Sequence, residues 1–212
     1  MKHLTKGVLA ASLLASTFMA TTANAEVTAN VGLMSEYHFR GIVQNSTATA
    51  NGGLDYENGN WSLGIWAADV EDGLEVDVYG AYGYEFESGF SLSAGVTKYL
   101  YTGDFDTGYD ELNLGAGLGK FSLEYTIGTW DGLEGQSFET EADYTFLGLT
   151  FEHEGFFATF GTFGGDFEGE YGEFGYGMEV ATFDVGVAVV ISGNDLSNDE
   201  ALYFTVSKSF SL

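Results

Sequence analysis

The sequence predicts an all-β fold, a transmembrane antiparallel up-and-down β-barrel of about 12 strands, with 10 or 14 strands as alternatives. Three observations predict it. An export signal stands at the N-terminus, apolar and polar residues alternate through most of the remaining chain, and short connections alternate with long ones. The last segment, 200–212, alternates to its final residue, as we expect of the closing strand of a bacterial outer-membrane barrel.

Residues 1–25 are typical of a Sec signal peptide. Two lysines form a basic head, an apolar stretch runs from about 8 to 20, and an Ala-Asn-Ala motif ends at Ala25. We expect cleavage after Ala25 and a barrel domain of residues 26–212. This remaining part has no apolar run approaching the roughly 20 residues of a membrane-spanning helix, so any membrane crossing is expected to use strands.

Twelve segments show the period of two that a half-buried strand requires. They are 27–40, 48–56, 61–67, 74–85, 90–101, 109–118, 121–130, 138–152, 156–163, 171–180, 183–192 and 200–212. In the first of them the alternation places Arg40 at the junction with an external loop. The pair Phe146-Leu147 breaks the alternation of its segment and predicts a β-bulge there.

The connections between these segments are of two kinds. Short ones lie near 58–60, 87–89, 119–120, 153–155 and 181–182. Longer polar ones lie near 40–46, 70–73, 102–108, 131–137, 164–170 and 193–199. Short periplasmic turns and longer external loops are typical of outer-membrane barrels with an even number of strands.

Aromatic residues gather at both ends of the predicted strands, which predicts two girdles at the membrane interfaces. Those that begin strands after short turns are Trp61, Phe90, Phe121, Phe156 and Phe183. Those near the opposite ends are Tyr99, Tyr101, Tyr109, Trp130 and Phe163.

The composition excludes several classes of function. The chain has 32 acidic and six basic residues and a net charge of −26, so it repels nucleic acid. It has no cysteine, which excludes disulfides and thiolate metal sites, and no proline, which suits uninterrupted strands. No Ser-His-acid arrangement is recognisable. We therefore expect neither an enzyme nor a cofactor.

One face of the predicted strands is polar and is expected to line the barrel lumen. The candidate pore-lining residues are Glu36, His38, Arg40, Asp55, Glu75, Asp77, Glu124, Glu141, Asp143, Glu173, Glu179 and Asp184. Rings of carboxylates favour cations in channels, and general solvation of an acidic chain is the competing interpretation. We assign no catalytic residue and no metal ligand; the spaced acids of 104–111 resemble a calcium loop only loosely.

Arg40 is the only arginine in the chain. Among inward acids it either forms a constriction that binds an anionic group or ties a loop to an inward carboxylate. The same inward face is rich in glycine, which either leaves a narrow wet path or relieves crowding in a curved sheet. Two lysines, Lys98 and Lys208, fall on the apolar face; Lys98 is near enough to a strand end to reach lipid headgroups.

The segment 35–45 (SEYHFRGIVQN) resembles a motif of the TorF family putative porins, Ser-x-Tyr-x-Phe-Arg-Gly-Ile followed by a Gln. The acidic-aromatic segment 74–79 and the tyrosines of 99–101 and 109–112 are similar to later parts of that family. Val43 stands where the family motif has Ser. The resemblance implies a channel-like barrel in the outer membrane, and it brings no pore or catalytic residues with it.

These observations predict a narrow, acidic, water-filled pore in the bacterial outer membrane that passes small cationic or zwitterionic solutes by passive diffusion. Its expected partners are outer-membrane lipid, lipopolysaccharide and small solutes, with no nucleic acid; the oligomeric state stays open. Two alternatives remain. One is a closed, non-conducting barrel with a structural or adhesive role, and the other is a soluble periplasmic β protein that binds a small apolar ligand.

Overall fold

The computed structural model describes residues 25–133, 140–196 and 200–212. The signal peptide predicted over 1–25 lies, apart from Ala25, outside the described residues, and its cleavage stays a prediction. Every regular element in the described ranges is a β-strand. Within those ranges no helix is long and apolar enough to cross a membrane.

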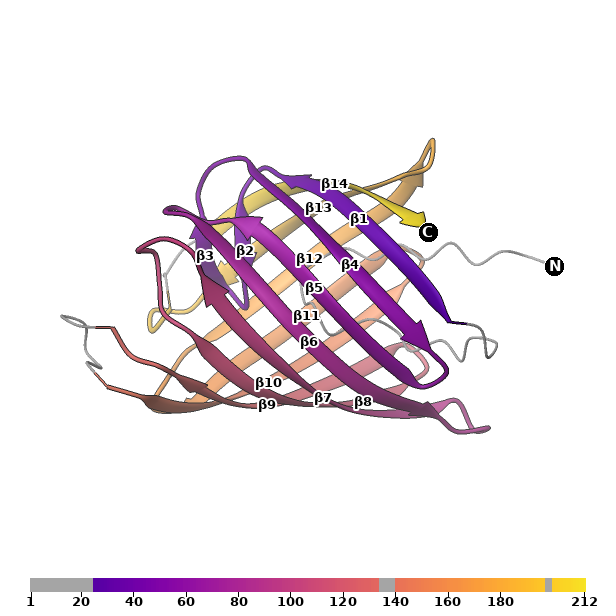
Figure 1. Cartoon of the computed structure of the whole chain (residues 1–212), viewed down its shortest axis with the longest axis horizontal. Coiled ribbons are helices and arrows are strands. Elements are labelled where there is room, and N and C mark those ends of the chain that lie inside the picture. The colour runs from indigo at the N-terminus through magenta and orange to yellow at the C-terminus, as the bar shows by residue number, and fades with distance from the viewer. Residues whose placement is uncertain (1–24, 134–139, 197–199) are drawn as a thin grey trace.

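Twelve strands form one closed barrel in which each strand pairs antiparallel with its neighbours (Figure 1). In ring order they are β1 (Glu26–Met34), β4 (Thr49–Asn58), β5 (Trp61–Asp69), β6 (Leu74–Glu85), β7 (Phe90–Tyr101), β8 (Tyr109–Leu118), β9 (Phe121–Trp130), β10 (Ala142–His153), β11 (Phe156–Gly165), β12 (Glu170–Val180), β13 (Phe183–Ser192) and β14 (Glu200–Ser211). β14 closes the ring on β1, from Thr28 opposite Ser211 to Met34 opposite Thr205. The predicted fold class is confirmed.

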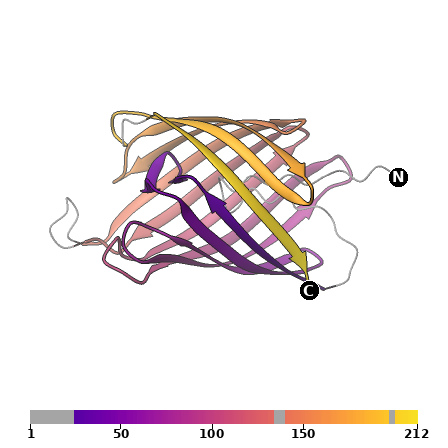
Figure 2. The same ribbon diagram turned by 90° about the horizontal axis from the view of Figure 1, so that it is seen from above.

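The two ends of the barrel differ. At one end, where β1 begins and β14 ends, tight turns join the strands; we call it the turn end (Figures 1 and 2). Four of these turns hold a glycine with positive φ, for example Gly59 at 61° and Gly119 at 65°, a conformation that costs glycine little. The opposite end carries the longer connections, and we call it the loop end.

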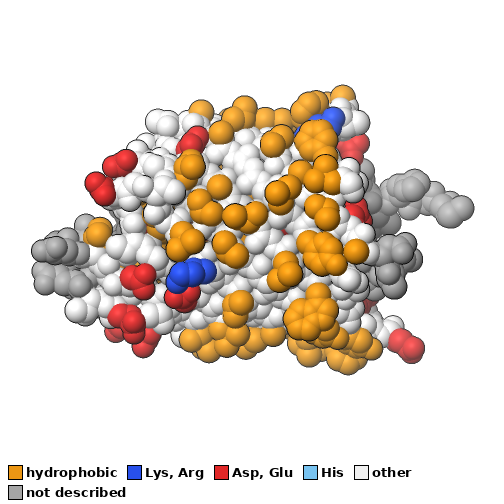
Figure 3. Space-filling view, in the orientation of Figure 1, with side chains coloured by type: hydrophobic (Ala, Val, Ile, Leu, Met, Phe, Trp, Pro, Cys, Tyr) orange, Lys and Arg blue, Asp and Glu red, His pale blue; other side chains and the backbone are white. Residues whose placement is uncertain are grey.

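The outer wall is apolar because one face of every strand carries large hydrophobic side chains. Trp61 and Phe121, for example, are 60% and 57% exposed. Figure 3 shows hydrophobic side chains spread over the wall and acidic ones gathered toward the ends. The aromatic residues predicted to begin strands after the short turns do so at the turn end, on β5, β7, β9, β11 and β13. The first predicted girdle therefore lies on the outer wall.

The second predicted girdle is wrong. Tyr99 and Trp130 are buried, and Tyr101, Tyr109 and Phe163 pack against buried clusters inside the barrel. Their place near strand ends suggested a membrane interface, but their alternation puts them on the lumen side. They instead form part of an aromatic filling of the loop end.

The first predicted strand, 27–40, is also wrong beyond Met34. After β1 the chain bends at 35–36 and enters the barrel as a separate two-stranded hairpin, β2 (Tyr37–Phe39) and β3 (Ile42–Asn45). We call residues 37–45 the inner hairpin. The predicted external loop at 40–46 is thus its tip and returning strand. Alternation continues through β2, so the pattern gave no sign that the chain leaves the wall.

Strand β10 shows no bulge, in contrast to the prediction at Phe146-Leu147. Its register with β9 and with β11 is continuous through both residues. The pattern misled because Tyr144 and Phe146 are large apolar residues that face inward, where both are buried. Leu147 faces outward, as the alternation of the strand then requires.

The two lysines of the outer wall have local partners. Lys98 Nζ lies 2.9 and 2.8 Å from the two carboxylate oxygens of Asp110 on the adjacent strand. Lys208 Nζ donates to Thr182 Oγ1 over 3.0 Å at the turn end, with the rings of Phe183 and Phe210 at 5.0 and 5.5 Å. Cation–π contacts of this kind offset the cost of a cation on an apolar wall.

Candidate functional site

The inner hairpin crosses the lumen at the loop end and contacts the wall on both sides. Tyr37 packs edge-on against Trp66 of β5, with ring centroids 5.7 Å apart. Phe39 packs at 5.7 Å against Tyr99 of β7. On the other side His38 stacks on Tyr203 of β14 at 5.5 Å. The hairpin is therefore wedged between strands from different parts of the ring.

The hairpin reaches the far wall through Arg40. β9 stands six places from β1 in the ring of twelve, directly opposite the strand from which the hairpin departs. Arg40 Nη1 donates to Glu111 Oε1 over 2.5 Å, and Nη2 donates to Glu111 Oε2 over 3.3 Å. Nη2 also donates to Glu124 Oε1 at 2.6 Å and to Thr126 Oγ1 at 3.1 Å. One guanidinium thus joins β8 and β9 to the hairpin.

The Arg40 socket is completed by hydroxyls and aromatic rings. Glu111 also accepts hydrogen bonds from Tyr99 at 3.0 Å and Tyr144 at 2.7 Å. The guanidinium carbon lies 4.3 Å from the ring centroid of Phe146 and 4.8 Å from that of Phe39. A planar cation with forked donors between two rings is the arrangement that favours arginine over lysine.

Burial shapes the charges of the inner hairpin. Desolvation acts to lower the pKa of Arg40, but the carboxylates of Glu111 and Glu124 outweigh it and hold that pKa well above its ordinary value. Burial, followed by repulsion from Glu75 and Asp77, raises the pKa of Tyr37 well above its ordinary value. Arg40 therefore stays charged, and the Tyr37 hydroxyl stays protonated and able to donate.

A second group of acids lies on β6. Glu75 accepts hydrogen bonds from Tyr37 at 2.6 Å and from Tyr101 at 2.8 Å. Asp77, two residues further on the same face, is 0% exposed, and neither carboxylate oxygen has a hydrogen-bond partner among the described residues. Burying a carboxylate in this way is costly, and Asp77 is the least satisfied group of the described lumen.

The other predicted pore-lining residues are spread over the barrel. Glu173 accepts a hydrogen bond from Tyr203, and Asp55 accepts from Tyr79 over 2.5 Å. Glu36 lies 3.2 Å from His38 at the base of the hairpin. Glu179 and Asp184 face each other across β12 and β13 near the turn end.

Two predicted lumen residues are misplaced. Asp143 is exposed on the outer face, where it accepts a hydrogen bond from Thr129 over 3.0 Å. Its neighbours Ala142 and Tyr144 take the inward positions, so the prediction that Asp143 lines the lumen is wrong. Glu141 precedes β10 and is exposed, so it is not part of the lumen wall either.

Glu111 is the main residue that the predicted site missed. Leu112 and Leu114 face outward on β8, so the alternation already places Glu111 inward. Sequence reasoning instead grouped it with the acids of a loose calcium-like segment. In the structure Asp106 of that segment accepts hydrogen bonds from Trp130 and Tyr109, at 2.9 and 2.7 Å. No three His, Cys, Asp or Glu side chains of the described residues are placed to hold a metal ion.

Some inward glycines make room for aromatic rings. A Cβ atom on Gly64 would lie 2.4 Å from the ring of Tyr79, and one on Gly128 would lie 2.2 Å from the ring of Tyr144. Both contacts are far below van der Waals distance. At these positions glycine lets a ring lie flat along the neighbouring strand, which favours the crowding interpretation over the open path.

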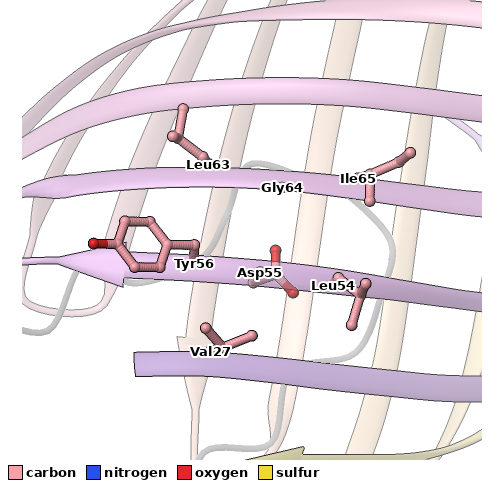
Figure 4. A pocket seen from close by; sticks show the side chains of 7 residues that line it. All are labelled: Val27, Leu54, Asp55, Tyr56, Leu63, Gly64 and Ile65. Atoms are coloured by element: carbon pink, nitrogen blue, oxygen red, sulfur yellow. The ribbon is translucent and has the colours of Figure 1, made fainter. Parts of the chain in front are cut away.

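A shallow apolar depression lies at the wall over β1, β4 and β5 (Figure 4). Its outward-facing lining is aliphatic or aromatic, with Leu54, Leu63 and Ile65 at its centre. It is an open feature of the apolar wall and contributes no cluster of polar groups. The lumen around the inner hairpin is therefore the stronger candidate site.

A model of a family described as a bacterial protein of unknown function (Gcw_chp) matches residues 19–210. No curated protein matches the chain. Similarity at the level of the sequence thus extends over nearly the whole chain without supplying an activity.

Solved membrane proteins share the fold at low identity. A chain from a study of the in-meso crystallization of membrane proteins has a TM-score of 0.59 at 9% identity, covering 88% of this chain and 84% of that one. The NanC porin has a TM-score of 0.51 at 10% identity, covering 88% of this chain and all of its own. The outer-membrane protein OpdK from Pseudomonas aeruginosa matches at 0.42 and 14% identity; the match covers 80% of this chain and 59% of OpdK.

Proposed function

The chain belongs to the Gcw_chp family of bacterial proteins of unknown function, and we propose that it is an outer-membrane porin for small cationic or zwitterionic solutes. The observation that carries the proposal is the closed ring of strands with an apolar outer wall and an interior whose charges are mostly carboxylates. Transport through it is passive diffusion. The resemblance of 35–45 to the TorF family putative porins agrees with this assignment.

The charge of the lumen supports selection of cations. Arg40 is the only basic side chain of the socket, and it is already paired with Glu111 and Glu124. Glu75, Asp77 and Glu173 also face the interior at this end. A low-dielectric wall strengthens the field of unpaired carboxylates, so cations gain and anions lose on entering the barrel.

The proposed location follows from the exterior of the barrel. Many large apolar side chains are exposed on the wall, and hydrocarbon is the solvent in which such a surface is stable. We place the barrel in the outer membrane, in contact with lipid and lipopolysaccharide, after export and cleavage following Ala25. A soluble periplasmic protein would expose this whole wall to water, which argues against that alternative.

The proposal is tested by reversal potentials. The mature chain, refolded in detergent and inserted into a planar bilayer under a potassium chloride gradient, is expected to show discrete conductance steps with a cation-selective reversal potential. An anion-selective reversal potential would contradict the assignment. Glu173→Gln is expected to reduce the preference, and Asp110→Asn, which changes an exposed carboxylate paired with Lys98 on the outer wall, is the matched control.

A closed, non-conducting barrel remains the second candidate, because the inner hairpin fills the loop end. It predicts a correctly folded protein that conducts neither as the wild type nor after the inner hairpin is released from the far wall. Conductance of a hairpin variant therefore separates the two functions.

A further inference from the structure

The inner hairpin is the obstruction of the lumen. Of its nine residues, Tyr37, His38, Arg40, Gln44 and Asn45 are buried with 9% exposure or less. The backbone at its tip is held as well, since Ser192 of β13 donates a hydrogen bond to the carbonyl of Gly41. A solute that crosses the barrel at this end must displace the hairpin.

The socket that receives Arg40 belongs to the wall and not to the hairpin. Glu111 is on β8, Glu124 and Thr126 are on β9, and Phe146 is on β10, three adjacent strands fixed by continuous pairing. Apart from Phe39, every group that contacts the guanidinium is therefore part of the barrel. The socket keeps its shape and its two carboxylates when the hairpin is elsewhere.

The chemistry of the socket specifies a guanidinium group. Two carboxylates accept donors along both edges of a plane, a hydroxyl accepts a further one, and an aromatic ring covers one face. A compact ion without N–H donors would leave these acceptors unsatisfied. A small solute that carries a guanidinium would satisfy them as Arg40 does.

Arg40 holds the socket at a cost that favours exchange. Its φ is 48°, the left-handed region that L residues with a Cβ avoid, and it stands with Gly41 at the tip of a two-residue turn. Taking a guanidinium out of water also offsets much of the attraction in a buried ion pair. A free guanidinium pays no backbone strain for the same contacts.

The socket can be approached from the turn end. The side chain of Glu111 is 0% exposed, but that of Glu124 is 20% exposed. On the turn-end side Glu124 is followed on the lumen face of β9 by Ser122, and β8 presents Gly115 and Gly117 at the same level. These small residues leave Glu124 as the accessible edge of the socket.

We propose that Glu111 and Glu124 form a binding site for the guanidinium group of a small solute, that Arg40 occupies this site in the closed pore, and that a solute which takes the site releases the inner hairpin. The inference rests on the proposed porin function, since it requires a solute in the lumen. Arg40 is then an internal occupant of the site through which the solute opens the pore.

Conductance in matched salts tests the site. In a planar bilayer we expect the wild type to conduct about tenfold more in dilute guanidinium chloride than in tetramethylammonium chloride at equal ionic strength, since only guanidinium has N–H donors for the socket. Equal conductance in the two salts would overturn the proposal. Glu111→Gln is expected to abolish the difference while the protein remains folded by circular dichroism.

Removal of the internal occupant tests the role of Arg40. Arg40→Ala is expected to conduct in both salts at about the level that the wild type reaches in guanidinium, because the latch is already absent. Lys98→Ala removes a positive charge from the outer wall and is the matched control, expected to behave as the wild type. An Arg40→Ala protein that folds and still needs guanidinium would contradict the role of Arg40.

A tether keeps the test independent of the stability of Arg40→Ala. The chain has no cysteine, so His38→Cys with Tyr203→Cys introduces a unique pair between the inner hairpin and β14. Joined by a short, reducible thiol cross-linker, this protein is expected to lose the guanidinium response and to regain it on reduction. An unchanged response in the cross-linked protein would overturn hairpin release.

The outcomes separate the two proposals. Cation-selective conductance that depends neither on guanidinium nor on Arg40 would leave the porin function standing and defeat the inference. Folded barrels that never conduct, whatever the salt or variant, would defeat both. Opening by guanidinium with anion selectivity would support the site and overturn the cationic preference of the pore.

Discussion

The loop-end and turn-end halves of the lumen are built from the same strands but have different interiors. On β7 the inward residues Ser91, Ser93 and Gly95 of the turn-end half are small and partly exposed, whereas Thr97 and Tyr99 of the loop-end half are buried. The large inward side chains occur where the inner hairpin gives them something to pack against. The difference teaches that the hairpin, rather than the barrel, determines the composition of the wall around it.

The largest expected effect comes from Phe146, at the centre of the loop-end filling. It lies 5.1 Å from Phe163 and 6.3 Å from Tyr171, measured between ring centroids, and covers the Arg40 guanidinium. Phe146→Ala is expected to lower the free energy of unfolding by about 3–5 kcal/mol, through lost contacts and a cavity. Urea titration of the refolded protein measures it. A loss under about 1 kcal/mol would show that the loop end is loosely packed.

A smaller loss is expected when the ion pair at the far wall is weakened. Glu111→Gln removes the charge that Arg40 meets in two hydrogen bonds, and we expect a loss of about 3 kcal/mol because Glu124 still pairs with the arginine. Glu124→Gln, at the more exposed side chain, is the comparison and should lose less. Equal losses in the same urea titration would show that burial does not distinguish the two carboxylates.

An effect of opposite sign is expected at Asp77. Its carboxylate is fully buried without a hydrogen-bond partner among the described residues, so Asp77→Asn is expected to raise the free energy of unfolding by about 1 kcal/mol. The matched change Glu75→Gln, at an acid that accepts two tyrosine hydroxyls, should lower it. Destabilisation by Asp77→Asn would indicate that this carboxylate is satisfied in the membrane.

The smallest effect is expected in the turn-end half. Ser93→Ala changes an inward, partly exposed residue beside Gly115, and the free energy of unfolding should stay within about 0.5 kcal/mol of the wild type. The same titration serves as the check. A loss as large as that of Phe146→Ala would remove the contrast between the two halves.

The ring of strands was predictable because its determinants are local. Alternation of apolar and polar residues places each strand, and turns such as Gly119-Lys120 separate them. Closure follows from the chemistry of strands in lipid, which leaves no stable open edge. Eleven predicted segments thus correspond to barrel strands, with boundaries that differ by a few residues.

The inner hairpin was not predictable in this way. Residues 37–39 continue the alternation of β1, and only tertiary contacts to strands far along the chain show that they leave the wall. The same omission explains the errors at Tyr99, Phe146 and Asp143. Without a partner inside the barrel, large aromatic residues have no reason to face inward, so the pattern assigned them to the membrane side or to a bulge.

The position of the inner hairpin between β1 and β4 constrains the order of assembly. The seam of the barrel joins Thr28 to Ser211, and such distant contacts form late because closing a long loop of chain is entropically costly. The hairpin departs from β1 itself, so it must be in place before β14 completes the ring. The later strands are therefore wound around the N-terminal segment as around a mandrel. A ring that closed with this segment outside would be a trapped topological isomer with an unobstructed bore.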